Sequence, residues 1–396
     1  MIAVPIEKST PTYRDVPSFV QEVQPEYPVY CVRPAVLRES AREFIEIFPG
    51  TVMYSVKCNP NPGVINALYE AGVRDFETAS LPEIKQVAEM SGRTCAYFMH
   101  PVKTRTAIRI AYGQYGVRHF VVDHRSELQK LIDEIGSNRV VVFVRVCPPE
   151  SSDALYSMSK KFGASAEEAV CLLRGIEQAR YQTGVTFHVG SQCLNPKDFG
   201  AALDLVGGVL ESAAVEPACI DVGGGFPVRY PNVGAPPLTD YIREITEGIR
   251  RNALPGTAMA FAEPGRALVG SGCSLLTRVV LRKTDRIYLN DGIHGGLSEL
   301  IDSQYQLNTR VIRIGGPVAE RIQPYHVFGP TCDSIDHLPP EFMLPTDLRN
   351  GDWIEFDQVG AYSNALSTSF NGFSSNQFIE VFDEPISASG NATGSR

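Results

Sequence analysis

Eight short runs rich in Val, Ile and Phe alternate with segments of helical periodicity between about residue 50 and residue 270, and this alternation strongly constrains the fold. Such an alternation is typical of repeated βα units around a parallel sheet. An open doubly wound sheet would more often have fewer strands and a GxGxxG turn, whereas eight units match a closed barrel. We therefore predict an α/β fold with a (β/α)₈ TIM-like barrel. The runs are 52–56, 73–79, 95–98, 117–122, 140–146, 184–189, 218–222 and 258–262.

The segments between these runs have the apolar spacing of amphipathic helices. One predicted apolar face consists of Leu128, Leu131, Ile132 and Ile135. Ser165 and Glu168 have the spacing of a capping box and predict the start of another helix.

The regions that flank the barrel have a different sequence pattern, with strand-like runs and little helical periodicity. After Gly270, strand-like runs are broken by Gly, Pro and Asp turns, which predicts a separate all-β domain. The run 27–32 is strand-like, and we expect it to join the C-terminal sheet. The expected division is an N-terminal segment joining the β domain (1–34), the barrel (35–266), the C-terminal β domain (267–386) and a disordered tail (387–396).

Composition narrows the class of partner and the compartment. The 396 residues carry a net charge of −9 and no long basic run, which argues against nucleic acid or an anionic membrane as the main partner. The nine cysteines form no CxxC pair and the seven histidines no cluster with metal spacing, so neither a disulfide framework nor a metal site is predicted. No signal peptide or membrane-spanning run is recognisable. We expect a cytoplasmic protein that acts on a small molecule.

Polar residues follow the apolar runs, at the strand ends where a barrel of this type places its active site. A lysine aimed into a barrel mouth can form a Schiff base, although a lone lysine at a strand end is more often a surface residue. If the strands are assigned correctly, these side chains converge on one mouth. They are Lys57, Glu77, Arg145, His188, Ser191, Gly223, Gly224, Gly225, Glu263, Gly265 and Arg266.

The triple glycine 223–225 allows two interpretations. It is compatible with a tight strand-to-helix turn and nothing more. From the glycines alone the turn is the favoured interpretation, but a phosphate cradle is also compatible, because glycines let backbone N–H groups approach an anion and barrels of this type favour phosphate sites after strands seven and eight. Neither of the common nucleotide-binding motifs surrounds it.

Six motifs occur in the order found in one enzyme family. They are 54–59 (YSVKCN), 187–191 (FHVGS), 221–227 (DVGGGFP), 262–266 (AEPGR), 329–333 (GPTCD), and 360–362 (GAY) with 370–373 (FNGF). On these motifs the chain resembles, over nearly its whole length, the fold type III pyridoxal-phosphate decarboxylases, the ornithine, lysine and diaminopimelate decarboxylase group, and within it ornithine decarboxylase most. The resemblance implies an alanine racemase-like barrel, a C-terminal β domain and pyridoxal 5′-phosphate as cofactor.

The resemblance also implies roles for individual residues. Lys57 would be the Schiff-base lysine, His188 would stack on the pyridine ring, and Glu263 would pair with the ring nitrogen so that the ring accepts electrons. Arg145 would lie near the phenolic oxygen, and Glu77 stands where relatives usually have an aspartate. The phosphate would be held by Ser191, Gly223, Gly224, Gly225, Arg266 and Tyr362. Gly265, which precedes Arg266, would also line the cofactor site.

Cys332 and Asp333 lie outside the barrel, and in the family they enter the neighbouring subunit's site. The resemblance therefore implies a homodimer with shared active sites, in which Cys332 protonates Cα and Asp333 receives the distal ammonium group of the substrate. Asp302 is the candidate for a second carboxylate near that amine, with Ser303 as the alternative alignment. Tyr362 is a further substrate-binding candidate.

The loop after Thr331 bears on the substrate. Diaminopimelate decarboxylases usually carry Cys-Glu-Ser-Gly-Asp, whereas this chain has Cys-Asp-Ser-Ile-Asp at 332–336, which favours a substrate with a cationic tail. L-Ornithine is the leading expectation and L-lysine the second, because one methylene is worth only about 1–3 kcal/mol of discrimination. The open alternatives are arginine, diaminopimelate and carboxynorspermidine as substrates, a racemase, and a non-catalytic regulatory binding protein of the same fold.

Overall fold

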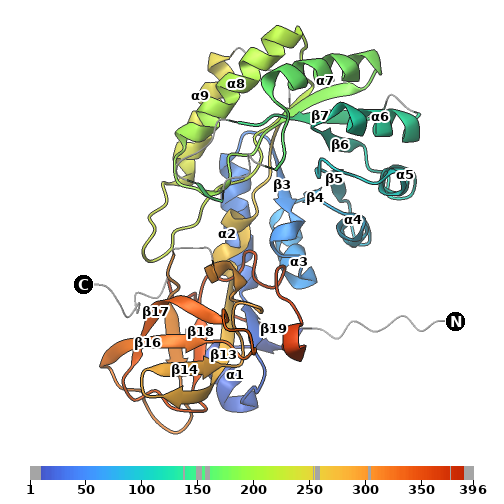
Figure 1. Cartoon of the computed structure of the whole chain (residues 1–396). Coiled ribbons are helices and arrows are strands. Elements are labelled where there is room, and N and C mark those ends of the chain that lie inside the picture. The colour runs from blue at the N-terminus through green and yellow to red at the C-terminus, as the bar shows by residue number, and fades with distance from the viewer. Residues whose placement is uncertain are drawn as a thin grey trace, which may run out of the picture.

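The computed structural model consists of a closed barrel and a β domain that lies at one side of it (Figure 1). It describes residues 10–136, 139–148, 154–156, 161–252, 254, 259–301, 305–374 and 376–387. The polar tail predicted to be disordered, apart from Ser387, and the substrate candidate Asp302 both lie outside the described residues.

Eight parallel strands close the barrel, in the order β11-β12-β3-β4-β5-β6-β7-β9. Each of the eight predicted apolar runs overlaps one strand, so the predicted barrel is confirmed. The strands are β3 (Thr51–Ser55), β4 (Asp75–Thr78), β5 (Cys95–Phe98), β6 (His119–Val122), β7 (Val141–Arg145), β9 (Gln182–Thr186), β11 (Cys219–Asp221) and β12 (Met259–Ala262).

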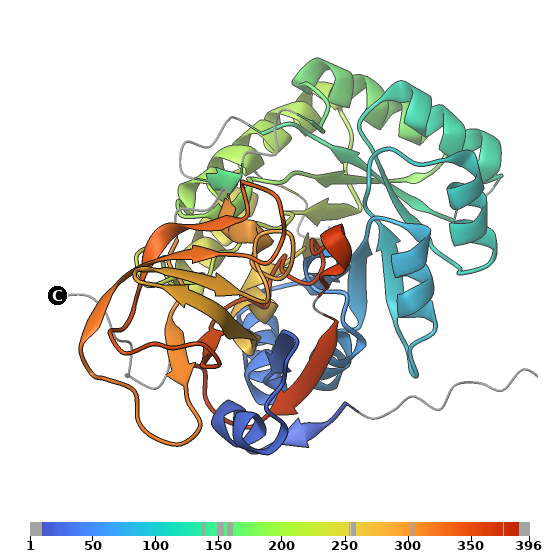
Figure 2. The same ribbon diagram turned by 60° about the horizontal axis from the view of Figure 1, so that its bottom comes forward.

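Helices cover the outside of the barrel (Figure 2). They are α2 (Pro34–Ile47), α3 (Pro62–Ala71), α4 (Leu81–Ala88), α5 (Arg105–Gly113), α6 (Arg125–Glu134), α7 (Ala166–Gln178), α8 (Lys197–Ala213), α9 (Leu238–Arg251) and the short α10 (Arg266–Val269). The capping box of Ser165 and Glu168 is confirmed at the start of α7. Ile132 lies on the same side of α6 as Leu128, since both line a groove between α6 and α7, but its side chain is 37% exposed.

The barrel interior is filled toward the first residues of its strands. Tyr97, Phe143 and Phe261 belong to a buried cluster there, and the ring of His119 stacks on Tyr97 with 4.2 Å between centroids. A barrel of this kind is a packed core rather than a channel. The predicted site residues of the barrel lie at the opposite end, where the strands terminate.

The β domain is a nine-stranded sheet that the two ends of the described chain build together. β2 (Val29–Val32) pairs with β13 (Cys273–Lys283) and β19 (Gln377–Val381), which brings the N-terminal segment into the sheet. The remaining elements are β1 (Thr12–Tyr13), α1 (Val16–Val23), β14 (Arg286–Leu289), β15 (Thr309–Ile312), β16 (Ile322–Phe328), β17 (His337–Pro345) and β18 (Trp353–Phe356). Separately, β8 (Ala154–Tyr156) and β10 (Ser191–Cys193) form a small antiparallel sheet that the sequence did not predict.

A buried ion network joins the N-terminal segment to the β domain. Arg33 Nη2 lies 2.9 Å from Glu355 Oε1, and Arg310 holds the other carboxylate oxygen at 2.6 Å. The Ser274 hydroxyl donates to Glu355 at 2.6 Å. Burial raises the pKa of Glu355, but Arg310 and Arg33 outweigh it and hold the pKa below its usual value. The network therefore depends on an ionised carboxylate.

We predict that Glu355→Ala destabilises the β domain by about 3–5 kcal/mol, because Arg33 and Arg310 lose the fully buried carboxylate between them and keep only the ion pairs with Asp383. Urea denaturation followed by the fluorescence of Trp353, the single tryptophan of the chain, measures the change. Since a lowered carboxyl pKa stabilises the folded state above its unfolded value of about 4.5, the deficit should shrink as pH falls through the folded pKa.

The matched control is Glu341→Ala in the same domain. Glu341 pairs with His326 at the surface, with both side chains about half exposed, and its loss should cost about 1 kcal/mol or less. Equal losses for the two variants would contradict the role given to Glu355.

Candidate active site

Lys57 lies at the mouth of the barrel, in the short 3₁₀ helix η1 (Val56–Cys58) that directly follows β3. Its ammonium group forms an ion pair with Glu77, a buried residue of the neighbouring strand β4. Burial by itself lowers the pKa of Lys57, but the Glu77 carboxylate, with Tyr362 and Glu263, raises it above its ordinary value. The resting amine is therefore a cation held against a carboxylate.

Two further carboxyl groups meet at the same mouth. Asp221 ends β11 and Glu263 directly follows β12, and both are buried. Burial and the proximity of Asp221 raise the pKa of Glu263 well above its usual value. Asp221 accepts hydrogen bonds from Thr186 Oγ1 at 2.7 Å and from the Gly223 N–H at 2.9 Å. Three carboxyl groups, those of Glu77, Asp221 and Glu263, therefore surround a single lysine, and a further cation would be favoured beside Asp221 and Glu263.

His188 follows β9 and carries a neutral ring. Its Nδ1 accepts a hydrogen bond from the Gly190 N–H at 3.0 Å, which leaves the proton on Nε2. Burial, with the charges of Arg145 and Lys57, lowers the pKa of His188 well below its usual value. The imidazole is thus a flat, uncharged surface at the mouth.

The glycine turn after β11 has no room for side chains. Gly223 and Gly225 have φ values of +67° and +107°, and a Cβ at either position would collide with the carbonyl oxygen of Phe187 or of Gly190. A Cβ at Gly224 would lie 3.1 Å from His188 Nε2. The tight turn expected from sequence is present, and it brings the backbone against the histidine.

Arg266 begins α10 and is buried beside this turn. Its guanidinium pairs with Glu299 through both terminal nitrogens, and Nη1 lies 2.8 Å from the Tyr230 hydroxyl. Ser191 Oγ lies 3.4 Å from Nη2, and the Tyr362 ring centroid lies 5.3 Å from the guanidinium carbon. Tyr362 is fixed by its N–H, which donates to the Cys58 carbonyl at 2.9 Å.

The remaining barrel candidates also reach this end. Arg145 is the last residue of β7. Gly265 packs against the lysine loop, since a Cβ there would lie 3.0 Å from Cys58 Cβ.

Cys332 and Asp333 stand apart on the loop between β16 and β17, where Cys332 is exposed and the Asp333 side chain is 30% exposed. Asn371 Oδ1 accepts from the Cys332 N–H at 3.0 Å and lies 3.1 Å from its sulfur. Asp333 Oδ2 lies 3.0 Å from His294 Nε2. The backbone N–H of Ile335, with His294, lowers the pKa of Asp333. The loop presents a thiol and a carboxylate side by side to solvent.

Sequence reasoning assigned no role to Asp221, His294, Glu299 or Asn371. Asp221 and Asn371 lay inside quoted motifs, and the signal that could have found them is their position beside an assigned residue. Glu299 lies in the segment from which Asp302 was chosen, but its partner Arg266 is 33 residues away in the other domain, so the sequence did not indicate this ion pair.

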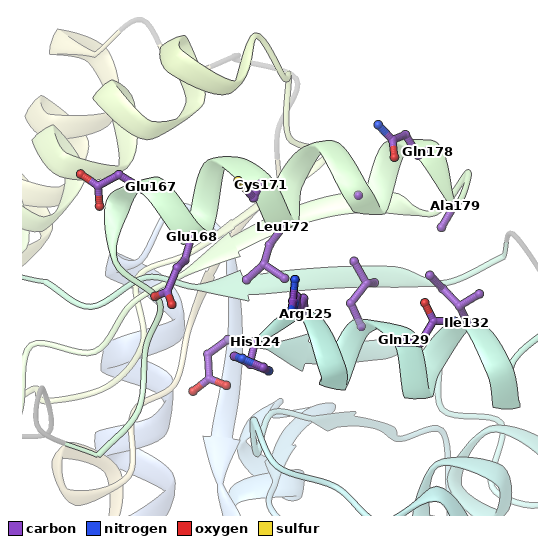
Figure 3. Close-up of a pocket in the computed structure, with 13 residues that line it drawn as sticks. His124, Arg125, Gln129, Ile132, Glu167, Glu168, Cys171, Leu172, Gln178 and Ala179 are labelled. Atoms are coloured by element: carbon purple, nitrogen blue, oxygen red, sulfur yellow. The ribbon is translucent and has the colours of Figure 1, made fainter.

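A large groove lies elsewhere on the barrel, with a volume of about 830 Å³ between α6 and α7 (Figure 3). His124 and Arg125 line one side of it, and Glu167 and Glu168 the other. None of the predicted site residues contributes to it, so the groove is separate from the mouth.

The described residues contain no cluster of three or more His, Cys, Asp or Glu with the geometry of a metal site. Within the same ranges, none of the helices combines the length and the apolar character needed to cross a membrane.

A family model described as "Pyridoxal-dependent decarboxylase, pyridoxal binding domain" matches residues 35–270, more than half of the chain. The chain belongs to this family. It is a pyridoxal-phosphate-dependent amino-acid decarboxylase, as the motifs led us to expect.

Curated and solved relatives agree with the family. The chain is 31% identical over 344 residues to a lysine/ornithine decarboxylase of Selenomonas ruminantium, covering 84% of each protein. It resembles the structure of lysine/ornithine decarboxylase complexed with cadaverine from Vibrio vulnificus, with a TM-score of 0.79, 31% identity and coverage of 92% of this chain and 97% of that one. The arginine decarboxylase of Paramecium bursaria Chlorella virus gives a TM-score of 0.80 at 27% identity, with coverage of 92% and 99%.

The mouth of this decarboxylase fits pyridoxal phosphate on its own chemistry. The buried carboxyls of Asp221 and Glu263 call for a cation, which a protonated pyridine nitrogen would provide. The glycine turn with Ser191 and Arg266 offers backbone and guanidinium donors for a phosphate. Lys57 provides an amine for the aldehyde.

We predict that Glu77→Gln lowers the pKa of Lys57 by about one to three pH units, because the opposing carboxylate is lost while the burial remains. Competitive acetylation of the cofactor-free protein across a pH series, with peptide mass spectrometry of Lys57, measures the midpoint.

Glu83→Gln is the matched control, since Glu83 lies nearby on α4 and accepts from the Ala79 N–H instead of pairing with Lys57. Its variant should shift the midpoint far less. An unchanged or raised midpoint in Glu77→Gln would show that the ion pair does not set the state of the amine.

Proposed function

We propose that the enzyme decarboxylates L-ornithine to putrescine, with L-lysine to cadaverine as a second activity. The observation that carries the proposal is the carboxylate of Asp333 beside the thiol of Cys332 on one exposed loop. A carboxylate can receive the distal ammonium of a basic amino acid, whereas diaminopimelate would also need a cation for its distal carboxylate. The relatives named for lysine, ornithine and arginine support a basic substrate.

The same loop supports a homodimer with shared active sites. Cys332 and Asp333 project from the β domain and are solvent-accessible in the single chain, although the proposal gives both a role in chemistry. Closing an active site expels water from the reacting atoms, so residues that act on the substrate are expected to be covered in the working enzyme. A second copy of the chain, seated over this loop, would cover it and place both residues in the partner's mouth.

Within the mouth, each residue has a task that its environment suits. When bound, pyridoxal phosphate draws electrons from Cα of the amino acid as carbon dioxide leaves. Lys57 would hold the aldehyde carbon, and Glu263 would hold the ring nitrogen in its protonated form. His188 would pack flat against the ring without adding charge, and Glu77 would keep the released lysine amine in place.

Around this centre the chain would fix the two ends of the cofactor and substrate. Ser191, Gly223, Gly224, Gly225 and Gly265 would surround the phosphate, together with Arg266 and Tyr362. Arg145 would face the phenolic oxygen. From the partner, Cys332 would deliver the proton to Cα, while Asp333 would hold the distal ammonium group. Asp302 completes the proposal as a second carboxylate for that group, although it lies outside the described residues.

The test of the substrate is direct incubation. With pyridoxal phosphate and equal concentrations of L-ornithine, L-lysine, L-arginine, meso-diaminopimelate or carboxynorspermidine, putrescine should form fastest and cadaverine second, as quantified by mass spectrometry. Asp333→Asn should lose about tenfold or more in kcat/KM for ornithine, since a charge-paired contact is removed.

Ser334→Ala, a neighbouring change that leaves both Asp333 and Cys332, is the control and should stay near the unmodified rate. Lysine formed from diaminopimelate faster than putrescine from ornithine would refute the substrate assignment. Absence of any amine product would direct attention to a regulatory binding role.

The shared site is tested by complementation. We predict that Lys57→Ala and Cys332→Ala, each inactive alone, regain about a quarter of the normal activity when mixed in equal amounts, because half of the dimers then contain one intact site out of two. Amine formation before and after mixing is the measurement, with each variant mixed with itself as the control. No recovery, despite subunit exchange seen by native mass spectrometry, would mean that both residues act within one chain.

A further inference from the structure

The guanidinium of Arg266 has five N–H donors, and the structure accounts for most of them. Nη1 meets the Tyr230 hydroxyl and Glu299 Oε2, each at 2.8 Å. Nη2 pairs with Glu299 Oε1, and its remaining contact is a long one of 3.4 Å to Ser191 Oγ. Nε is buried and has no hydrogen-bond partner among the described residues.

This accounting divides the guanidinium into two edges. The end formed by Nη1 and Nη2 is taken by Glu299. The side formed by Nε and Nη2 carries an unsatisfied buried donor and lies toward Ser191. A side edge of this kind is a bidentate fork for one oxyanion, and a buried donor left without a partner costs free energy until one arrives.

We propose that Glu299 is a positioning residue for the cofactor phosphate. Because Glu299 occupies the end of the guanidinium, the Nε–Nη2 fork stays free to bind the phosphate. The glycine turn and Ser191 would bind the same phosphate. The inference rests on the proposed function, because it takes Arg266 as a phosphate ligand.

Glu299 itself is held in place from the β domain. It lies in the 3₁₀ helix η3 (Ser298–Ile301), and the Tyr305 hydroxyl donates to its Oε2. Tyr305 stacks on Tyr230 with 3.8 Å between centroids and an interplanar angle of 7°. The carboxylate, the two phenols and Arg266 therefore form one buried assembly across the two domains.

The main alternative is that Glu299 weakens phosphate binding. Glu299 is an anion beside the site of a dianion, and through-space repulsion could make it a competitor for Arg266. The two readings predict opposite signs for the affinity change in Glu299→Gln, which keeps the size of the side chain and removes its charge.

The experiment measures dissociation constants for pyridoxal phosphate and for pyridoxal, which lacks the phosphate, by titrating the cofactor-free full chain and following absorbance. Glu299→Gln should weaken pyridoxal phosphate binding about tenfold and leave pyridoxal binding within about twofold. Tyr305→Phe, which removes one hydrogen bond to Glu299, should give a smaller loss with the same selectivity. Glu341→Gln, a surface carboxylate of the same domain, is the control and should change neither constant.

The outcomes separate the possibilities. Equal weakening of both ligands would show a merely structural role, and tighter binding of pyridoxal phosphate would show competition; either result overturns the proposal. Arg266→Gln tests the proposed function separately. If Arg266→Gln leaves the affinity for pyridoxal phosphate unchanged, Arg266 is not a phosphate ligand and the proposed function loses that assignment. If Arg266→Gln weakens pyridoxal phosphate binding but Glu299→Gln does not, only the role of Glu299 is refuted.

Discussion

Closure of the sheet between β9 and β11 forces side chains from separate strands into one small space. The packed aromatic layer at the other end leaves the strand termini as the place where polar groups can gather. Lys57, Glu77, Asp221 and Glu263 come from four strand ends and meet there, with the three carboxyl groups buried and the lysine side chain 34% exposed. Burial and the neighbouring charges shift the pKa values of Lys57, Asp221 and Glu263, so the electrostatics of the mouth follow from the topology.

Much of this arrangement is readable from the sequence because the barrel imposes a strict order. Eight apolar runs predict eight strands, and the residue after each run is then aimed at the mouth, which is how Lys57 and Glu263 could be singled out. The β domain is recognisable from its broken strand-like runs. The barrel strands and the strand-like runs of the β domain can be predicted because they depend mainly on residue periodicity and position along the chain, which are local signals.

The features that escaped sequence reasoning depend on side chains meeting across long sequence separations. Asp221, before a glycine turn, looks like a turn-forming residue until its neighbour Glu263 is seen. Glu299 becomes meaningful only through Arg266, and His294 only through Asp333. Ile132 has the spacing of a core residue, yet α6 and α7 stand far enough apart for it to line an open groove. Helical periodicity marks a face and does not say how closely that face is covered.

The ion pair of Arg266 with Glu299 limits where the chain can be cut to separate the barrel from the β domain. The family match ends at residue 270, before η3, the 3₁₀ helix of the β domain that contains Glu299. A barrel excised at that boundary would retain Arg266 and lose its carboxylate, together with Tyr305, Tyr362 and the contact of Tyr362 with the lysine loop. The barrel and the sheet are therefore not interchangeable modules. In recombination or design, a barrel from one relative would need a β domain that brings a matching counter-ion.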